Sequence, residues 1–387
     1  MQKFKNKTLL CITLVLLLTA VLGTAPLVTA HGSLHGMLIY TANVPSVSTS
    51  ELMFSIELGN DPDNGRTLIA GDNSISTAYP RLTNNGLAIL AQVFLDSSNP
   101  EFIDQNTTTP VVGVLATDGT GLTPLTTVAE GAAFGASFSP DERQIVFAYA
   151  NADTDNDGAI TIHDTAHLAV KELGQLDPLN PAPGQLASSS RIRMLTRNED
   201  FSVDKPAFLT DDLIVFTGIK PDASTTVYLY NVASSSLTPL APVGAQSRNP
   251  AVSQDGNQIA MEVSTITENY DAVYDVESKT WSRLPVTGMP DNSFAWSVDG
   301  TLAIAISNGS MWQIQILDGT GLRTLVEIPQ KISGLNFSPD GRVLAYLWDF
   351  DGPPGNVLAV ATLDGGYDAS VTSPDSDIID YDWVPED

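Results

Sequence analysis

Residues 334–349 read GLNFSPDGRVLAYLWD, and this stretch decides the fold. Leu335 and Phe337 alternate with small or polar residues, as on a half-buried strand, and residues 343–348 form a second apolar run. The Ser-Pro-Asp-Gly sequence at 338–341 is typical of a tight turn. The stretch therefore predicts two β-strands joined as a hairpin.

The same hairpin recurs along the chain. Related copies lie at residues 78–92, 136–150, 206–218, 250–263 and 294–307, and a half copy, YDWVPED, lies at 381–387. The equivalent apolar anchors are Leu82, Phe138, Phe208, Val252, Trp296, Phe337 and Trp383, with spacings of 56, 70, 44, 44, 41 and 46 residues. A period of about 40–45 residues, built of short strands and Gly/Asp turns, indicates a β-propeller. Seven anchors predict an all-β fold of seven four-stranded antiparallel blades.

The two ends of the repeat region each supply half a blade. Residues 381–387 match only the first half of the unit, and residues 36–44, GMLIYTANV, read as a second strand with no first strand before it. We expect residues 379–384 to pair antiparallel with residues 37–43. This pairing would close the ring and leave no sheet edge exposed.

The repeat resembles the TolB-type (WD40-like) propeller repeat, which runs Pro-x-Trp/Phe-Ser-Pro-Asp-Gly into an apolar strand. The likeness is strongest at residues 136–150 and 334–349, and weakest at 78–92 and 206–218. The resemblance implies a closed propeller. TolB proteins also carry an α/β domain before the propeller. This chain leaves no room for one, so partner binding through such a domain is not expected.

The first thirty residues predict a secretory signal peptide. Lys3, Lys5 and Lys7 precede an apolar core at residues 9–22, and small residues favour cleavage after Ala30. We therefore expect a secreted or periplasmic protein with no membrane span in the mature chain. The sequence leaves open which compartment it reaches, and whether the segment is cleaved or kept as an anchor. Residues 31–387 are expected to form a single propeller domain with an insertion at about 151–191.

The charge balance excludes some partners. The chain has 18 basic and 45 acidic residues, a net charge of −27, and losing the three lysines of the signal makes it −30. Such a surface repels nucleic acid and anionic membranes. The only cysteine, Cys11, lies in the signal segment, so the mature chain has no disulfide. We expect a soluble monomer.

Residues 153–164, DTDNDGAITIHD, resemble a dockerin or EF-hand calcium loop. Aspartates stand at loop positions 1, 3, 5 and 12, a carbonyl ligand is expected at position 7, and Gly158 allows the sharp turn at position 6. The predicted structural calcium site comprises Asp153, Asp155, Asp157, Ala159 and Asp164. An acidic surface loop that binds no metal is the alternative interpretation.

The sequence favours binding over catalysis. The four histidines, His31, His35, His163 and His167, lie outside the expected strands, and no Gly-x-Ser-x-Gly motif is present. We therefore expect no catalytic residues, and an exported non-catalytic module that binds a protein or glycan of the cell envelope or medium. The alternative is a secreted hydrolase or lyase with its active site in the central funnel. Convergent carboxylates with a cation or an arginine there would favour the enzyme, and an open apolar or aromatic rim would favour the binding module.

Overall fold

The computed structural model describes most of the chain after the predicted signal segment. The described residues are 36–44, 51–59, 65–71, 75–95, 108–175, 182–197, 199–286, 288–349, 355–366, 368–373 and 376–385. All of them belong to one compact unit, Leu34–Asp387. The predicted signal peptide, residues 1–30, lies outside the described residues. Within them, no helix is long and apolar enough to cross a membrane.

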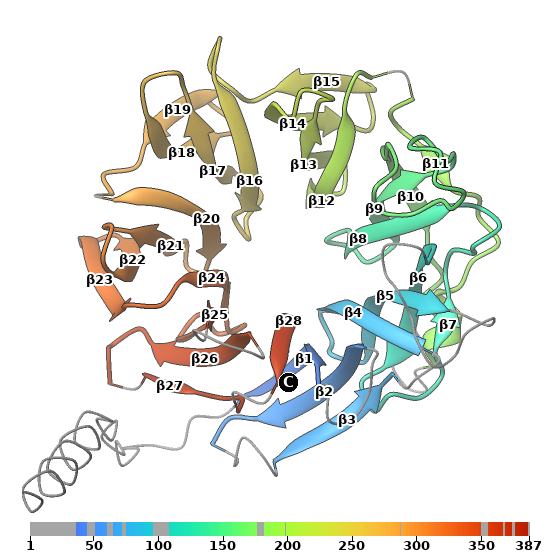
Figure 1. Cartoon of the computed structure of the whole chain (residues 1–387), viewed down its shortest axis with the longest axis horizontal. Coiled ribbons are helices and arrows are strands. Elements are labelled where there is room, and N and C mark those ends of the chain that lie inside the picture. Colours follow the sequence, from blue (N-terminus) through green and yellow to red (C-terminus); the bar gives the residue numbers. More distant parts are fainter. Residues whose placement is uncertain are drawn as a thin grey trace, which may run out of the picture. The chain divides into compact units, whose positions relative to one another are not determined.

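The strands form seven four-stranded antiparallel sheets around a common centre, as predicted (Figure 1). We number these sheets as blades, beginning with the blade that joins the two ends, and give each from its innermost strand outward.

Blade 1 comprises β28 (Asp377–Val384), β1 (Met37–Asn43), β2 (Glu51–Glu57) and β3 (Arg66–Ala70). Blade 2 comprises β4 (Ile75–Leu82), β5 (Ala88–Leu95), β6 (Pro110–Ala116) and β7 (Thr123–Pro124). Blade 3 comprises β8 (Ala132–Phe138), β9 (Gln144–Ala150), β10 (His167–Glu172) and β11 (Arg193–Met194). Blade 4 comprises β12 (Ser202–Thr210), β13 (Leu213–Ile219), β14 (Thr225–Asn231) and β15 (Ser236–Pro239). Blade 5 comprises β16 (Gln246–Val252), β17 (Gln258–Ser264), β18 (Asn269–Asp275) and β19 (Thr280–Arg283). Blade 6 comprises β20 (Met289–Trp296), β21 (Leu302–Ser307), β22 (Trp312–Asp318) and β23 (Gly321–Ile328). Blade 7 comprises β24 (Ile332–Phe337), β25 (Val343–Asp349), β26 (Asn356–Thr362) and β27 (Asp368–Ser370).

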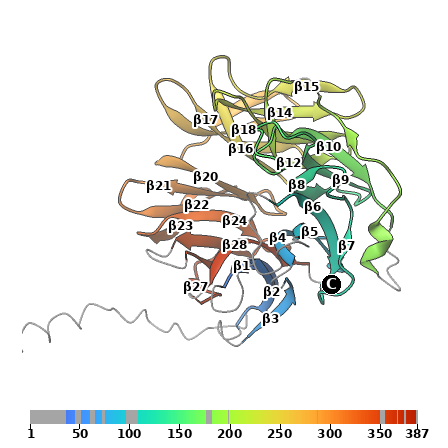
Figure 2. The same cartoon turned by 45° about the vertical axis from the view of Figure 1, so that its right-hand side comes forward.

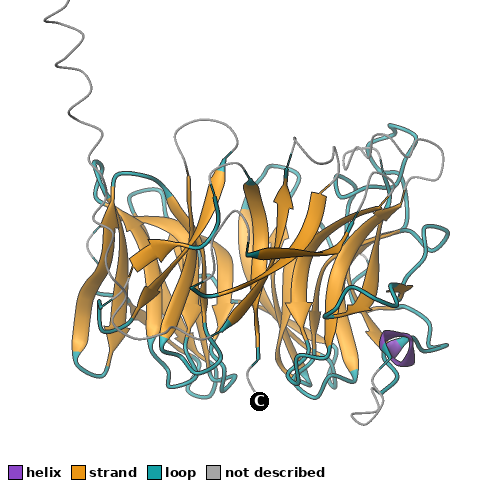
Figure 3. Cartoon of the chain, turned by 90° about the horizontal axis from the view of Figure 1, so that it is seen from below, coloured by secondary structure: helices purple, strands orange, loops and turns teal. Residues whose placement is uncertain are grey.

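Blade 1 closes the ring in the predicted register. Met37 pairs with Val384, Leu38 with Trp383, and the pairing continues to Asn43. Turned views show the blades side by side, with their connecting loops gathered at the two ends of the strands (Figures 2 and 3). Because the last strand completes the first blade, the ring has no unpaired blade.

The hydrophobic core lies between neighbouring blades. On β13, Ile214 and Phe216 pack against blade 3, whereas Val215 packs against blade 5. A blade has two apolar faces, and both are buried only because a neighbour lies on each side. The anchor tryptophans belong to these contacts, as expected. Trp296 Nε1 donates to the Ala251 carbonyl of the preceding blade at 3.1 Å.

The Ser-Pro-Asp-Gly turns are held by a repeated hydrogen-bond pattern. In blade 7, Ser338 Oγ donates to Asp340 Oδ1 at 2.6 Å and accepts from the Val343 N–H at 3.0 Å. Asp340 Oδ1 also accepts from the Arg342 N–H at 3.0 Å. The same pairing of a hydroxyl with a carboxylate occurs in three other blades, at Ser139 and Asp141, Ser253 and Asp255, and Ser297 and Asp299. The turn aspartates are therefore structural.

We expect Asp340→Ala to lower the free energy of unfolding by about 1–2 kcal/mol, the scale of lost charge-assisted bonds. Urea unfolding of the variant measures this loss. Arg342→Ala is the matched control, because its side chain is 86% exposed and lies 3.7 Å from Asp340 Oδ2. A pair this exposed contributes about 0–1 kcal/mol. An Asp340→Ala protein as stable as the wild type would contradict the structural role.

The predicted insertion at about 151–191 is divided by a strand. Residues 151–166 join β9 to β10, and residues 173–192 join β10 to β11 around a short 3-10 helix, Pro183–Leu186. A strand is expected after the acidic loop, near His167–Val170, and β10 lies there, with six residues, HLAVKE, between two polar connections. His167 begins this strand, so the expectation that no histidine lies on a blade strand is wrong.

Candidate functional site: a charged cluster at the ring centre and an acidic loop

The innermost strands carry β-bulges at one level of the ring. Six register shifts lie between Ala78 and Arg81 on β4, Phe134 and Ser137 on β8, Asp204 and Ala207 on β12, Arg248 and Ala251 on β16, Pro290 and Phe294 on β20, and Ser333 and Asn336 on β24. The seventh, on β28, lies opposite Thr41 and Ala42 of β1. A bulge leaves its extra residues outside the hydrogen-bond ladder and redirects their side chains. Three bulges contain a proline, Pro80, Pro206 or Pro250, where no N–H is needed. The fold thus repeats one irregular site around its centre.

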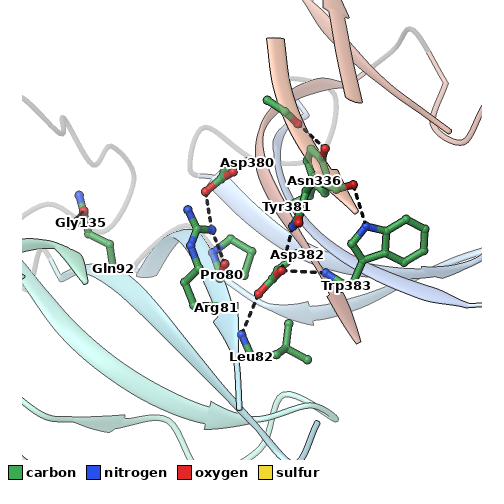
Figure 4. A network of polar contacts seen from close by, with 11 residues as sticks. Pro80, Arg81, Leu82, Gln92, Gly135, Asn336, Asp380, Tyr381, Asp382 and Trp383 are labelled. Carbon is green, nitrogen blue, oxygen red and sulfur yellow. Dashed lines mark hydrogen bonds and ion pairs between the residues drawn. The ribbon is translucent and has the colours of Figure 1, made fainter. Parts of the chain in front are cut away.

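At this level, blades 1 and 2 bring three charged side chains together (Figure 4). Arg81 Nη1 lies 2.8 Å from Asp380 Oδ2, and the same nitrogen donates to the Pro80 carbonyl at 2.6 Å. Asp382 lies two residues beyond Asp380 on β28 and therefore on the same face of the strand. Arg81 has 41% of its side chain exposed and Asp380 has 22%, so solvent reaches this ion pair.

Asp382 links three blades. Its Oδ2 accepts from the Leu82 N–H of blade 2 at 3.0 Å. Its Oδ1 accepts from Asn336 Nδ2 of blade 7 at 3.1 Å and from the Trp383 N–H at 3.0 Å. The next residue repeats the link, because Trp383 Nε1 donates to the Asn336 carbonyl at 3.2 Å. Asp382 is thus fixed in place beside the Arg81–Asp380 pair.

The two carboxylates have different environments. Burial raises the pKa of Asp382 above its usual value, although Arg81 and the N–H groups of Leu82 and Trp383 lower it. Asp380 lies in the solvent-accessible ion pair with Arg81. Carboxyl groups whose pKa is shifted by burial beside a charged partner are more frequent at functional sites.

Tyr79 lies beside this cluster in a conformation that bulky residues rarely adopt. Its φ is +55°, and 41% of its surface is exposed. Burial, and then the charges of Glu51 and Asp380, raise the pKa of its hydroxyl, so this group keeps its proton at neutral pH. Lys205 occupies the equivalent bulge of blade 4, with φ +47°. Gly135, Asn249 and Gly334 also have positive φ in the bulges of blades 3, 5 and 7, so this conformation belongs to the repeated bulge.

Sequence reasoning missed these residues, although the sequence contains a signal for them. Arg81 and Asp382 each precede a repeat anchor, Leu82 and Trp383, by one residue. The predicted ring closure makes these two anchors neighbours. Opposite charges at one repeat position in adjacent blades therefore indicate a charged cluster, although the ion pair itself joins Arg81 to Asp380, three residues before its anchor.

The predicted calcium loop folds around its own carboxylates. Asp153 Oδ1 accepts from the Asn156 N–H at 2.6 Å, and Asp153 Oδ2 accepts from the Gly158 N–H at 3.0 Å. Gly158 has φ +98°, which glycine adopts without strain. At the other end of the loop, Asp164 Oδ2 accepts from the Thr161 N–H at 2.8 Å, and Asp164 Oδ1 accepts from the Thr154 hydroxyl at 2.9 Å.

The loop gathers three of its four predicted carboxylates. Oxygens of Asp153, Asp155 and Asp164 lie within 4.8 Å of one another, and such a group can hold a metal ion. Asp157 is not in this group, and its Oδ1 accepts from the Ala159 N–H at 2.9 Å. Asp164 is buried. Burial would raise its pKa, but the bonds from Thr161 and Thr154 lower it below the usual value, so Asp164 stays ionised.

No protein-family model and no curated protein matches the chain, whereas many solved structures share its fold. A puromycin-hydrolyzing peptidase of Mycobacterium tuberculosis is 15% identical, with a TM-score of 0.58 over 84% of this chain and 50% of that one. The acylaminoacyl peptidase of Pyrococcus horikoshii is 12% identical, with a TM-score of 0.57 over 88% of this chain and 51% of that one. TolB of Acinetobacter baumannii is 14% identical, with a TM-score of 0.48 over 81% of this chain and 82% of that one. The chain spans about half the length of these peptidases.

These comparisons correct one expectation. The predicted non-catalytic binding module is wrong, because propellers of this construction occur in peptidases, so the fold does not speak against hydrolysis. The ring centre agrees with this correction, because it presents convergent carboxylates with an arginine. The scarcity of histidine misled the sequence analysis, since a carboxylate can also act as the general base in hydrolysis.

Proposed function

We propose that this propeller is a hydrolase that cleaves peptide bonds at the charged cluster in its centre. The observation that carries the proposal is the partly exposed Arg81–Asp380 ion pair, held beside the fixed carboxyl group of Asp382. The peptidases that share the fold support peptides as the substrate class. A lyase, the other form of the enzyme hypothesis, has no such support among these structures.

Each residue of the cluster has a distinct role in the proposed reaction. Asp380 takes a proton from a water molecule, which attacks the peptide carbonyl carbon. The Arg81 guanidinium stabilises the negative charge that develops on the carbonyl oxygen. The C–N bond then breaks, and the leaving amine takes the proton from Asp380. Asp382 positions the pair and does not contact the substrate. The neutral Tyr79 hydroxyl can donate a hydrogen bond to the substrate.

The test uses the purified chain and a defined mixture of peptides. Mass spectrometry of the products is expected to show new termini that accumulate with time. Wild-type protein that folds as a ring but leaves every peptide of a sequence-diverse mixture intact would contradict the proposal.

We also propose that residues 153–164 bind calcium, with Asp153, Asp155 and Asp164 as carboxylate ligands. Calcium prefers hard oxygen ligands, and the loop supplies them from two of its turns. Asp157 and the Ala159 carbonyl complete the proposed set. The ion would neutralise the crowded carboxylates and tie the loop to β10, which follows directly. Export through residues 1–30 would bring the loop into a medium in which calcium is more abundant than in the cytosol.

Calcium is expected to raise the melting temperature by a few degrees. A ligand that binds only the folded state stabilises it by about 2.7 kcal/mol at one hundred times its Kd. EDTA should reverse the shift, and Asp153→Ala/Asp155→Ala should abolish it. Glu277→Ala, an exposed acidic residue outside the loop, is the control and should keep it. Calorimetry that detects no calcium binding to the folded wild type would contradict the proposal.

A further inference from the structure

Blade 5 carries three charged side chains in a row across its strands, far from the acidic loop of blade 3. Arg248 on β16 pairs with Glu262 on β17, and Glu262 pairs with Asp271 on β18 (Figure 1 shows these strands). Directly paired residues point to the same face of a sheet. The row therefore places two acidic groups side by side with one basic group at its end.

Arg248 forms an ion pair with only one of the two acidic groups, Glu262. Arg248 Nη2 lies 2.6 Å from Glu262 Oε1, and Arg248 Nε lies 3.1 Å from Glu262 Oε2. The Glu262 side chain is 1% exposed, so this pair satisfies a buried charge. Asp271 is 0% exposed, and neither of its oxygens has a hydrogen-bond partner. An ionised carboxylate in that position is strongly unfavourable.

Asp271 faces the interface between blades 5 and 6. Val273, two residues along β18, packs there with Phe294 and Ile304 of blade 6. Gln315 lies directly opposite Ile304 on β22 and so belongs to the same interface. Its Oε1 is also buried and has no hydrogen-bond partner. The interface thus holds an unpartnered acid on one side and an unpartnered acceptor on the other.

The remaining charges nearby are otherwise engaged. Arg283 lies opposite Ala272, on the other face of the blade, where it binds Glu268 at 2.9 Å. Asp275 lies on the same face of β18 as Asp271, at the end of the strand, and its Oδ1 accepts from the Ser278 hydroxyl at 2.6 Å. Among the described side chains of β20, β21 and β22, the only charged one is Asp318, which pairs with Arg323. Within the described residues, Arg248 and Glu262 are therefore the charged groups beside Asp271 on that face.

We infer that Asp271 is a buried proton-binding site. Its carboxyl group is protonated in the folded protein in weakly acidic solution, and its ionisation weakens the contact between blades 5 and 6. The protonated acid is uncharged, which removes the cost of burial, and it has an O–H to donate. Gln315 Oε1 of blade 6, on the same interface, is the acceptor to which that O–H would donate a hydrogen bond.

The direction of the effect follows from the environment of Asp271. Burial, and then the charge of Glu262, raise the pKa of Asp271 from 3.8 to about 7. A group whose pKa is higher in the folded state stabilises the fold below its unfolded pKa, which is about 3.9. That stability is lost progressively as the pH rises toward 7, and the loss is complete above it. The buried acid therefore makes the folded ring more stable in acidic than in neutral solution.

The test compares the melting temperature of Asp271→Asn with that of the wild type from pH 4 to pH 9. Asparagine is neutral at every pH, so only the wild type should lose stability through this group as the pH rises. Relative to the variant, the melting temperature of the wild type should fall by several degrees between pH 4 and pH 7. Above pH 7 the difference should stay constant. Asp275→Asn, at the half-buried end of the same strand, is the control and should follow the wild type. An Asp271→Asn protein that fails to fold, or that follows the wild type at every pH, would overturn the inference.

A second variant tests the role of the neighbouring charge. Glu262→Gln removes the negative charge beside Asp271 and frees the Arg248 guanidinium. The pH at which the melting temperature levels off should therefore move to a lower value than in the wild type. An unchanged or higher value would contradict the contribution of Glu262 to the proton-binding site.

Discussion

An Asp380→Asn protein is expected to cleave peptides about 10²–10⁴-fold more slowly than the wild type, the usual contribution of a general base. Asparagine has nearly the shape of aspartate but cannot take a proton from water. The fold should survive the change, because the Arg81–Asp380 pair is partly exposed and such pairs contribute about 0–1 kcal/mol to stability. The measurement is the initial rate of cleavage, with the melting temperature recorded for each variant.

Two further variants make this prediction specific. Arg81→Lys keeps a positive charge but loses the planar guanidinium, so it should retain more activity than Arg81→Gln. Asp318→Asn removes a carboxylate that pairs with Arg323 on the outer strands of blade 6, and it should leave the rate unchanged. If Asp380→Asn were as active as the wild type, the reaction would not take place at this cluster.

Deletion of residues 377–387 is expected to abolish cooperative folding. The deletion removes β28, which buries Ile378, Tyr381 and Trp383 between blades. Each such side chain contributes about 1.5–3 kcal/mol, so the three together approach the 5–15 kcal/mol by which a domain is stable. The loss would also leave the inner edge of β1 unpaired, which favours aggregation.

Circular dichroism during heating and the elution volume on size exclusion measure this effect. The matched control is the deletion of residues 385–387, which leaves β28 intact and should behave as the wild type. A protein ending at residue 376 that stays monomeric and melts at the wild-type temperature would show that the ring does not depend on its closing strand.

The repeat made the fold predictable from the sequence. Each hairpin places its apolar residues on alternate faces and its turn on Ser, Asp and Gly, so local chemistry alone specifies strand, turn and strand. The half-repeats at the two ends then required closure, and Leu38 does pair with Trp383. Strand β10 does not belong to a repeated hairpin motif, and its six residues lie between two polar connections.

The ring centre could not be found by the same reasoning. Arg81 and Asp380 are 299 residues apart in the sequence, and neither belongs to a motif. Only ring closure brings β28, which carries Asp380, next to β4, which carries Arg81, and the bulges influence which side chains meet there. The calcium loop shows the opposite case. Its twelve contiguous residues carry the pattern, and the structure brings Asp153, Asp155 and Asp164 together. Asp157 stands in the same pattern but lies outside that group, and its Oδ1 accepts from the Ala159 N–H.

The most direct test of the central claim is cleavage in water enriched in oxygen-18, followed by mass spectrometry of the product peptides. If the ring hydrolyses peptide bonds at Asp380, each new carboxyl terminus made by the wild type will carry one oxygen-18 atom, and Asp380→Asn will produce almost none. Product formation at equal rates by both proteins, or no labelled product from the folded wild type, would contradict the account.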